Sequence, residues 1–119
     1  MSLTVSTEQR QHVVVITVAG ELDMATAPQL QQRVDDALGQ ELHHLVFDLA
    51  GVPFCDSTGL SVFVRAKNRC DDLGGYVRLA APQRGVRRIL EVSGLVDVLS
   101  TYATVEEALS ATEEPAPAE

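Results

Sequence analysis

The alternation of apolar and polar positions along the chain predicts several β-strands. Leu3 and Val5 alternate with polar neighbours, as in a half-buried edge strand, and residues 7–12 form a polar stretch that predicts a turn. The run 13–19 is continuous and rich in β-branched residues, which predicts a central strand buried on both faces. Further apolar segments predict strands over 42–49 and 76–80, and a short edge strand over 96–102.

Between these strands, apolar residues recur three and four positions apart, which is typical of amphipathic helices. Thr26 is placed to cap the first helix, and Pro28 lies in its first turn, where a missing N–H costs little. The second helix begins at Ser57 and ends at the glycine pair 74–75, and the third lies between Pro82 and Gly94. Thr104 and Glu107 form a capping box, in which each side chain accepts a hydrogen bond from the other residue's amide, at the start of a last helix. The residues predicted to face the core are Ala27, Leu30, Val34 and Leu38 in the first helix, Leu60, Phe63, Val64, Cys70 and Leu73 in the second, and Val86, Ile89 and Leu90 in the third.

This order of elements predicts one α/β domain over residues 1–109. Two strands are followed by helices that alternate with strands, which favours a small, mostly parallel sheet of four to five strands packed against about four helices. A length of 119 residues with 45% hydrophobic residues fits one modest core. From Ser110 onward the chain contains mainly Ala, Thr, Glu and Pro, so we expect a disordered tail over 110–119.

The charge balance bears on the kind of partner. Seventeen acidic residues against nine basic ones give a net charge of −8, which repels nucleic acid and favours a protein partner with a basic patch. Residues 1–10 are polar and do not resemble a signal peptide, and the longest apolar run, 13–20, is too short to span a membrane. We therefore expect a cytoplasmic protein with no membrane segment.

The two cysteines, Cys55 and Cys70, match no metal-binding spacing and form no disulfide framework. We expect two reduced, largely buried thiols, with a redox role for Cys55 as the alternative. The chain also lacks a glycine-rich phosphate loop with its lysine. We therefore expect neither a metal nor a cofactor.

Residues 56–60, Asp-Ser-Thr-Gly-Leu, are the most informative segment, because they lie where a strand hands over to a helix. A serine at a helix N-cap faces free backbone N–H groups and the positive end of the helix dipole, a place that suits an anion, either bound or covalently attached. The simpler interpretation is that Ser57 only caps the helix. Two details speak against this interpretation. Gly59 in the first turn costs about 1 kcal/mol of helix propensity relative to alanine, which suggests a close approach to the backbone. Asp56 also adds a carboxylate that a plain serine cap does not need.

A second segment, 20–23 (Gly-Glu-Leu-Asp), ends the preceding strand. Its acidic residues are explained by the coming helix N-terminus. Functional loops of parallel sheets gather at the carboxyl ends of the strands, however. If the two strands are parallel, Asp23 and Ser57 lie at the same edge.

Other constellations argue against catalysis. The Asp-Ser-Thr-Gly run carries one residue more than the Asp-Thr/Ser-Gly triplet of aspartic proteases, and the chain has no Gly-x-Ser-x-Gly elbow. The histidines and one group of arginines are interpreted as solvated surface residues. They are His12, His43 and His44 at strand edges and Arg84, Arg87 and Arg88 along one helix. A small hydrolase using Asp56 and Ser57 is the alternative, but we predict that the protein is not an enzyme.

Three segments in the same order resemble the STAS domains of bacterial anti-sigma factor antagonists. Residues 20–23 resemble the family's Gly-Glu-Leu/Ile-Asp, and residues 52–60 resemble its Phe/Tyr-x-Asp-Ser-Ser/Thr-Gly-Leu, with Phe54 in the aromatic place. Residues 88–95 resemble its closing segment, which ends in Ser/Thr-Gly-Leu. The likeness covers roughly residues 3–109. Ser61 departs from it, since many members carry glycine there.

The resemblance implies a phosphorylation switch. The unphosphorylated domain would bind an anti-sigma factor that is also an ATP-dependent serine kinase, and so free the sigma factor. The kinase would then phosphorylate Ser57, with Thr58 as the runner-up acceptor, and a PP2C-type phosphatase would reverse the step. The expected partner contacts are Asp23, Asp56, Ser57, Thr58 and Gly59, and the free protein is expected to be a monomer. The alternative is a STAS scaffold or regulatory subunit of a signalling or lipid-transport complex, without serine phosphorylation.

Overall fold

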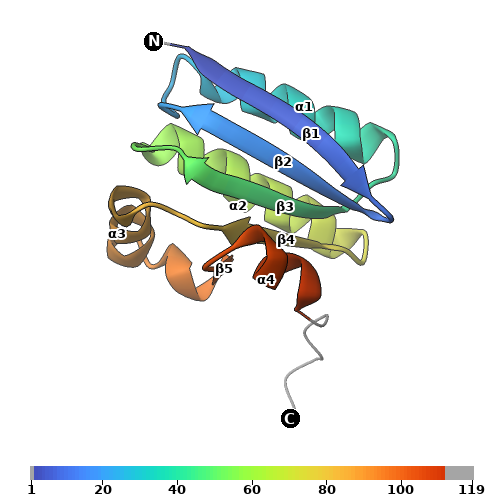
Figure 1. Cartoon of the computed structure of the whole chain (residues 1–119). Coiled ribbons are helices and arrows are strands. Elements are labelled where there is room, and N and C mark those ends of the chain that lie inside the picture. Colours follow the sequence, from blue (N-terminus) through green and yellow to red (C-terminus); the bar gives the residue numbers. More distant parts are fainter. Residues whose placement is uncertain (1, 112–119) are drawn as a thin grey trace.

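The computed structural model describes residues 2–111 and shows one five-stranded sheet with helices on both faces (Figure 1). The strands are β1 Leu3–Arg10, β2 Val13–Gly20, β3 His44–Gly51, β4 Tyr76–Ala80 and β5 Ser100–Tyr102. The helices are α1 Ala27–Gly39, α2 Ser57–Asp72, α3 Arg84–Val92 and α4 Val105–Ser110, with a single 3₁₀ turn, η1, at Leu95–Asp97. The predicted α/β class is confirmed.

The strands lie in the order β1-β2-β3-β4-β5. β1 is antiparallel to β2 and the other three pairs are parallel. Parallel neighbours need a crossover, and the chain supplies α1, α2 and α3 for the three of them. The carboxyl ends of β2, β3 and β4 therefore meet at one edge of the sheet.

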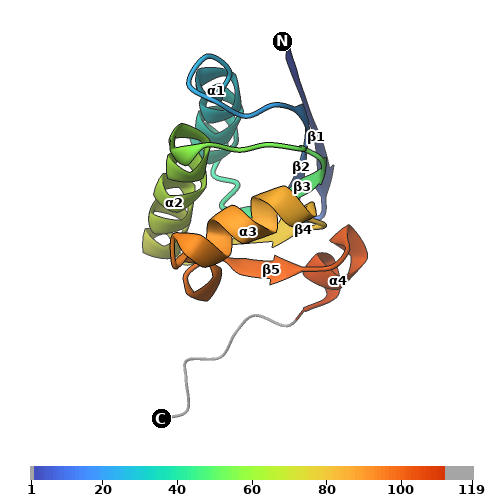
Figure 2. The same cartoon turned by 90° about the vertical axis from the view of Figure 1, so that its left-hand side faces the viewer.

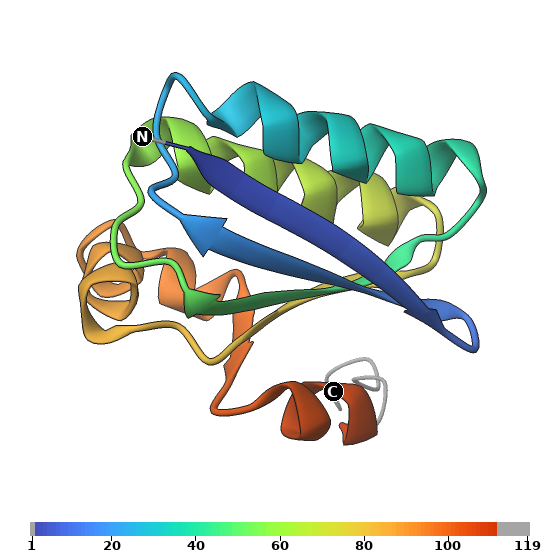
Figure 3. The same ribbon diagram turned by 45° about the horizontal axis from the view of Figure 1, so that its top comes forward.

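The helices are divided unequally between the two faces. α1 and α2 lie side by side on one face, and α4 lies on the other (Figures 2 and 3). α3 lies at the carboxyl end of the sheet, in front of the strands in Figure 2. The edge where the β2–α1 and β3–α2 connections meet therefore has a helix beside it.

The main core fills the space between the sheet and α1, α2 and α3. Phe47 of β3 and Phe63 of α2 are both almost fully buried and meet in a T-shaped contact, with 4.9 Å between ring centroids. A smaller cluster lies under α4 on the other face, formed by Val13, Val15, Val46, Ala80 and Ala108. With few aromatic residues, Val, Leu, Ile and Ala make up most of both clusters.

Two strand predictions are corrected by the structure. The polar stretch 7–12 is not a turn, because β1 continues to Arg10 and only Gln11 and His12 remain for the hairpin loop. The outer half of β1 is an exposed edge strand, so its residues pair with β2 through the backbone without needing apolar side chains. The predicted edge strand over 96–102 is also shorter, because η1 occupies its first part and β5 begins at Ser100.

Burial along β2 and α2 also differs from the predictions. Thr17 and Ala19 of β2 are exposed, because the six-residue α4 covers only the amino-terminal half of that face. Leu73 is 54% exposed just beyond α2, so the apolar face of this helix ends one turn earlier than its sequence pattern indicates.

The capping box of α4 is confirmed in part. The Thr104 hydroxyl accepts a hydrogen bond from the Glu107 amide at 3.1 Å. The Glu107 carboxylate, however, accepts from the amide of Ala103, at 3.3 Å, and not from that of Thr104. Ser110 belongs to α4, and the rest of the predicted tail, apart from Ala111, lies outside the described residues.

A buried arginine on β4, which the sequence analysis did not single out, holds α4 against the sheet. The Arg78 side chain is 4% exposed, and its guanidinium lies 3.7 Å from the centroid of the Tyr76 ring. Nη1 donates hydrogen bonds to the carbonyl oxygens of Ala108 at 2.8 Å and Ala111 at 3.0 Å. A cation at the carboxyl end of a helix is favourable, because the carbonyls there lack partners and carry partial negative charge.

Across residues 2–111, none of the helices combines the length and the apolar character that a bilayer crossing requires.

Gly75 provides a test of how α2 is joined to β4. A β-carbon at this position would lie 1.7 Å from the carbonyl oxygen of His43, a backbone atom that also accepts from the Tyr76 amide. We expect Gly75→Ala to lower the free energy of unfolding by about 2 kcal/mol or more, because backbone must move to accommodate the methyl group. The measurement is urea unfolding followed by circular dichroism. Gly39→Ala is the control, since a β-carbon there would meet no atom from the rest of the fold within 4 Å. An equal loss in both variants would contradict this assignment.

Candidate functional site

The two segments singled out in the sequence are joined directly by backbone hydrogen bonds. Leu22 pairs with Cys55 in an isolated parallel bridge beyond the ends of β2 and β3. The Leu22 amide donates to the carbonyl oxygen of Phe54 at 3.0 Å, and the Asp56 amide donates to the carbonyl oxygen of Leu22 at 3.0 Å. Asp23 and Asp56 each follow a residue of this bridge. The prediction that Asp23 and Ser57 lie at the same edge of the sheet is confirmed.

A third segment, leading into α3, is joined to the same edge. The side-chain amide of Gln83 donates to the carbonyl oxygen of Ala50 at 2.7 Å. A β-carbon on Gly85 would lie 3.2 Å from the carbonyl oxygen of Pro53, so α3 begins close against the β3–α2 connection. Three connections, after β2, β3 and β4, therefore form one continuous edge.

Asp56, and not Ser57, caps α2. The Asp56 backbone is extended, and its Oδ1 accepts hydrogen bonds from the amides of Thr58 at 2.9 Å and Gly59 at 3.1 Å. The prediction of a serine N-cap is therefore wrong by one residue. Asp and Ser are similarly good N-cap residues, so the sequence Asp-Ser left two neighbouring candidates. The carboxylate that seemed superfluous to a cap is the cap itself.

Ser57 is the first residue of α2, and its side chain is exposed. Its hydroxyl makes no hydrogen bond to any residue that the structure describes, while its carbonyl oxygen accepts from the Ser61 hydroxyl at 3.0 Å. Thr58 is half-buried by comparison. The arrangement presents one free hydroxyl at a helix start, where the local field favours negative charge.

Gly59 is required by packing, and not by a ligand. A β-carbon there would lie 2.7 Å from Cγ of Leu22 and 2.8 Å from Sγ of Cys55. Gly59 is buried, so the first turn of α2 lies directly on the Leu22–Cys55 bridge. The predicted close approach to this backbone is confirmed, and the close neighbours are Leu22 and Cys55 of the chain itself.

Asp23 stabilises the turn that leads into α1, although it is not the N-cap of that helix. Its Oδ1 accepts from the amides of Ala25 at 2.9 Å and Thr26 at 3.1 Å. The predicted cap, Thr26, makes no side-chain capping bond; its hydroxyl donates to the carbonyl oxygen of Glu21 at 2.8 Å and accepts from the Asp23 amide. Both candidate carboxylates thus stabilise their own connections and leave a negative charge at this edge.

The thiols are buried and unreactive in this setting. Cys55 is 1% exposed and Cys70 is fully buried. Burial raises the pKa of Cys55 to about 12, with the neighbouring Asp56 charge adding to the effect, and raises the pKa of Cys70 to about 11. Because thiolate is the reactive form, these pKa values argue against the redox alternative for Cys55.

Three large apolar side chains are exposed on the connections and the helix that form this edge, and the sequence analysis singled out only Phe54 among them. Met24 is 75% exposed, Phe54 47% and Val92 78%, although each is a large apolar residue. A hollow of about 310 Å³ lies between the start of α2 and α3, and it is lined by Ser57, Leu60, Arg88, Ile89, Val92 and Ser93. Exposed apolar groups gathered beside one polar group are typical of a protein-binding surface.

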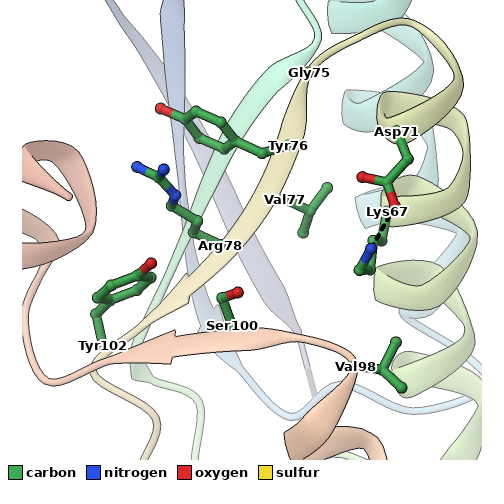
Figure 4. Close-up of a pocket in the computed structure, with 9 residues that line it drawn as sticks. All are labelled: Lys67, Asp71, Gly75, Tyr76, Val77, Arg78, Val98, Ser100 and Tyr102. Carbon is green, nitrogen blue, oxygen red and sulfur yellow. Dashed lines mark hydrogen bonds and ion pairs between the residues drawn. The ribbon is translucent and has the colours of Figure 1, made fainter. Parts of the chain in front are cut away.

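A second hollow, shown in Figure 4, is explained by the fold. It lies along β4 and β5 and is lined in part by Arg78, whose guanidinium is held between Tyr76 and the carbonyls of α4. On its other side Lys67 forms an ion pair with Asp71 within α2. These charged groups already have partners, so we assign this hollow no function.

The histidines lie far from the serine. His12 immediately precedes β2 and His44 begins β3, so both lie at the end of the sheet opposite Ser57. The ring centroids of His12 and His44 are 4.8 Å apart, and those of His43 and His44 are 5.0 Å apart. His12 is exposed and the other two are half-buried, so the prediction of solvated groups holds for His12 only. Within residues 2–111 no group of three or more His, Cys, Asp or Glu side chains is arranged to hold a metal ion.

The fold and this edge define a small α/β domain that presents a serine at the start of α2. The family model of the STAS domain matches residues 4–108, and the chain belongs to this family. The anti-sigma-F factor antagonist RsfA from Mycobacterium tuberculosis (strain ATCC 25618 / H37Rv) is 33% identical over 113 residues, which cover 93% of this chain and 88% of RsfA.

Two solved structures extend the comparison. The crystal structure of an anti-sigma factor antagonist from Mycobacterium paratuberculosis is 31% identical, with a TM-score of 0.86 and coverage of 95% of this chain and 96% of that one. The Bacillus cell fate determinant SpoIIAA, solved in its phosphorylated form, is 25% identical, with a TM-score of 0.72 and coverage of 89% and 96%.

The capping role of Asp56 can be separated from its charge. We expect Asp56→Ala to lower the free energy of unfolding by about 1 kcal/mol, because two amides of α2 lose their acceptor. Asp56→Asn should retain most of the stability, since its side-chain oxygen accepts the same bonds without the charge. Urea unfolding of the three proteins measures both effects. Equal losses in both variants would show that the charge, and not the cap, supplies the stability.

Proposed function

We propose that this protein is an anti-sigma factor antagonist whose binding is switched by phosphorylation of Ser57. In the unphosphorylated state it binds an anti-sigma factor that is also a serine kinase, and the sigma factor is released. The observation that carries the proposal is the exposed, unengaged hydroxyl of Ser57 at the start of α2. The names of RsfA and of the Mycobacterium paratuberculosis protein support the antagonist role, and the phosphorylated form of SpoIIAA supports the modification.

In the proposed step the chain is the substrate and the partner is the catalyst. The Ser57 hydroxyl oxygen attacks the γ-phosphorus of ATP, and the bond between this phosphorus and the oxygen bridging it to the β-phosphorus breaks. ADP leaves, and the hydroxyl proton goes to a base of the kinase. A PP2C-type phosphatase hydrolyses the phosphate ester and restores the hydroxyl. Because ATP is the donor, we place the cycle in the cytoplasm. We also expect the free protein to be a monomer.

The geometry favours Ser57 over Thr58 as the acceptor. Ser57 is exposed, whereas Thr58 is half-buried, and Thr58 donates its amide to the cap. A kinase active site must surround the accepting oxygen, which a half-buried side chain restricts.

Phosphorylation at this point can alter binding without altering the fold. A phosphate adds about −1.5 to −2 charge and three acceptor oxygens, and a helix N-terminus tolerates negative charge. The carboxylates of Asp23 and Asp56 already stand at this edge, and both are engaged by backbone amides. A partner surface fitted to a small neutral hydroxyl would meet added bulk and a stronger negative field.

The partner contact extends beyond the five residues expected from the resemblance. Asp23, Asp56, Ser57 and Thr58 reach the surface, whereas Gly59 is buried and acts by letting α2 pack on the bridge. The exposed apolar side chains of Met24, Phe54 and Val92 supply the area that a stable contact needs.

Ser57→Ala tests the acceptor. We expect this variant to bind the kinase partner as the wild type does and to gain no phosphoryl group on incubation with the kinase and ATP, because the attacking oxygen is gone. Intact-mass measurement and pull-down give the two results. Thr58→Ala is the control and should still gain one phosphoryl group. Full phosphorylation of Ser57→Ala would exclude Ser57 as the acceptor, and a wild-type protein that no candidate kinase modifies would favour the scaffold function.

Ser57→Asp tests the charge. A loss of 2–3 kcal/mol at an interface weakens binding about 30- to 150-fold, and we expect a weakening of this size when a carboxylate replaces the hydroxyl. Ser57→Asn has the same size without the charge and should bind more tightly than Ser57→Asp. Isothermal titration with the partner measures the difference. Unchanged affinity in Ser57→Asp would sink the charge explanation.

A further inference from the structure

The hollow beside Ser57 contains one charged side chain. It lies between the start of α2 and α3, and Ser57 and Arg88 line it from opposite helices. Its other walls are largely apolar, formed by Leu60, Ile89 and Val92. The hydroxyl of Ser93, the remaining polar group, donates to the carbonyl oxygens of Ile89 and Leu90 in its own helix. Of the six lining residues, Arg88 alone can supply a cation to a group attached at Ser57.

Arg88 differs from the arginines of α2, whose side chains have partners in the chain, and from the other arginines of α3 in its position. Arg69 is paired with Asp35 at 2.8 Å. Arg65 lines a neighbouring hollow that Ser57 also lines, but its guanidinium donates to Gln31 at 3.2 Å. The Arg88 side chain is exposed and forms no ion pair within the part of the chain that the structure describes. Arg84 and Arg87 are also exposed on α3, but neither lines the hollow. The position of Arg88, and not merely its charge, sets it apart.

We propose that Arg88 is the internal partner of the phosphate on Ser57, and so a positioning residue of the switch. This inference rests on the proposed function only in that Ser57 carries a phosphate. A guanidinium matches two phosphate oxygens at once through its planar fork. The apolar walls formed by Leu60, Ile89 and Val92 weaken the solvent screening of this pair.

The pairing changes the surface in two ways. Before phosphorylation, the guanidinium and the apolar hollow are both open to a partner. After it, the guanidinium is held against the phosphate and the two groups together close the hollow. The phosphorylated protein thus loses its neutral hydroxyl, a free cation and an apolar recess in one step. This explains how one modification can disrupt binding while the fold is retained.

The test measures the phosphate itself and needs neither kinase nor partner. Phosphoserine is placed at position 57 by genetic encoding, and the second pKa of the phosphate, ordinarily about 6, is followed by ³¹P NMR. A nearby cation favours the dianion, so we expect Arg88→Gln to raise this pKa by about half a pH unit relative to the arginine form. Arg65, which lines the neighbouring hollow with Ser57, and the carboxylates of Asp23 and Asp56 are present in every variant, so the difference reports Arg88.

Two further variants make the result specific. Arg87→Gln removes the same charge from the same helix outside the hollow and should leave the phosphate pKa nearly unchanged. Arg88→Lys keeps the charge without the planar fork of the guanidinium. Its phosphate pKa should lie between that of Arg88→Gln and that of the arginine form. An unchanged pKa in Arg88→Gln, or an equal rise in Arg87→Gln, would overturn the proposal. Because the phosphate is installed without a kinase, failure of Ser57 to be phosphorylated enzymatically would count against the proposed function alone.

Discussion

The backbone bridge between Leu22 and Cys55 is the constraint on which the functional edge depends. Its hydrogen bonds extend the pairing of β2 and β3 beyond the sheet and hold the β2–α1 and β3–α2 connections together. The first turn of α2 lies directly on this bridge, so closely that position 59 has no room for a side chain. The position of Ser57 is therefore fixed by two connections and a helix, and not by a free loop.

Two carboxylates satisfy the backbone at this edge and leave the serine hydroxyl free. Asp56 accepts hydrogen bonds from two amides of α2, and Asp23 accepts hydrogen bonds from two amides of the turn that precedes α1. If Ser57 were the cap, modification of its oxygen would remove a stabilising bond from α2. Because Asp56 caps the helix instead, a phosphate can be added to Ser57 and removed from it without disturbing the helix start. This division of labour between two adjacent residues would make the proposed switch compatible with a stable fold.

Two arginines, one in β4 and one in the helix that follows it, lie in opposite environments. Arg78 is buried, stacked on Tyr76 and bonded to the last carbonyls of α4, so its charge is used to hold the smaller layer in place. Arg88, on the helix that follows β4, is exposed beside an apolar hollow. In a chain with a net charge of −8, such a cation next to a serine stands out electrostatically. Neither role is visible in the sequence, where both residues are simply basic positions in a strand and a helix.

The sequence by itself determined the α/β class, the helices and most strands, because the period of apolar residues follows directly from the geometry of each element. It also indicated the serine segment and its partner segment after β2. It misjudged the polar half of β1, since an edge strand needs backbone pairing and few apolar side chains. Only the tertiary structure decided which of Asp56 and Ser57 caps α2 and why position 59 is glycine. It also placed Arg88 and Ser57 in the lining of one hollow. These features depend either on contacts between segments distant in the chain or on a choice between two nearly equal local hydrogen bonds. Such contacts and choices leave no periodic signal in the sequence.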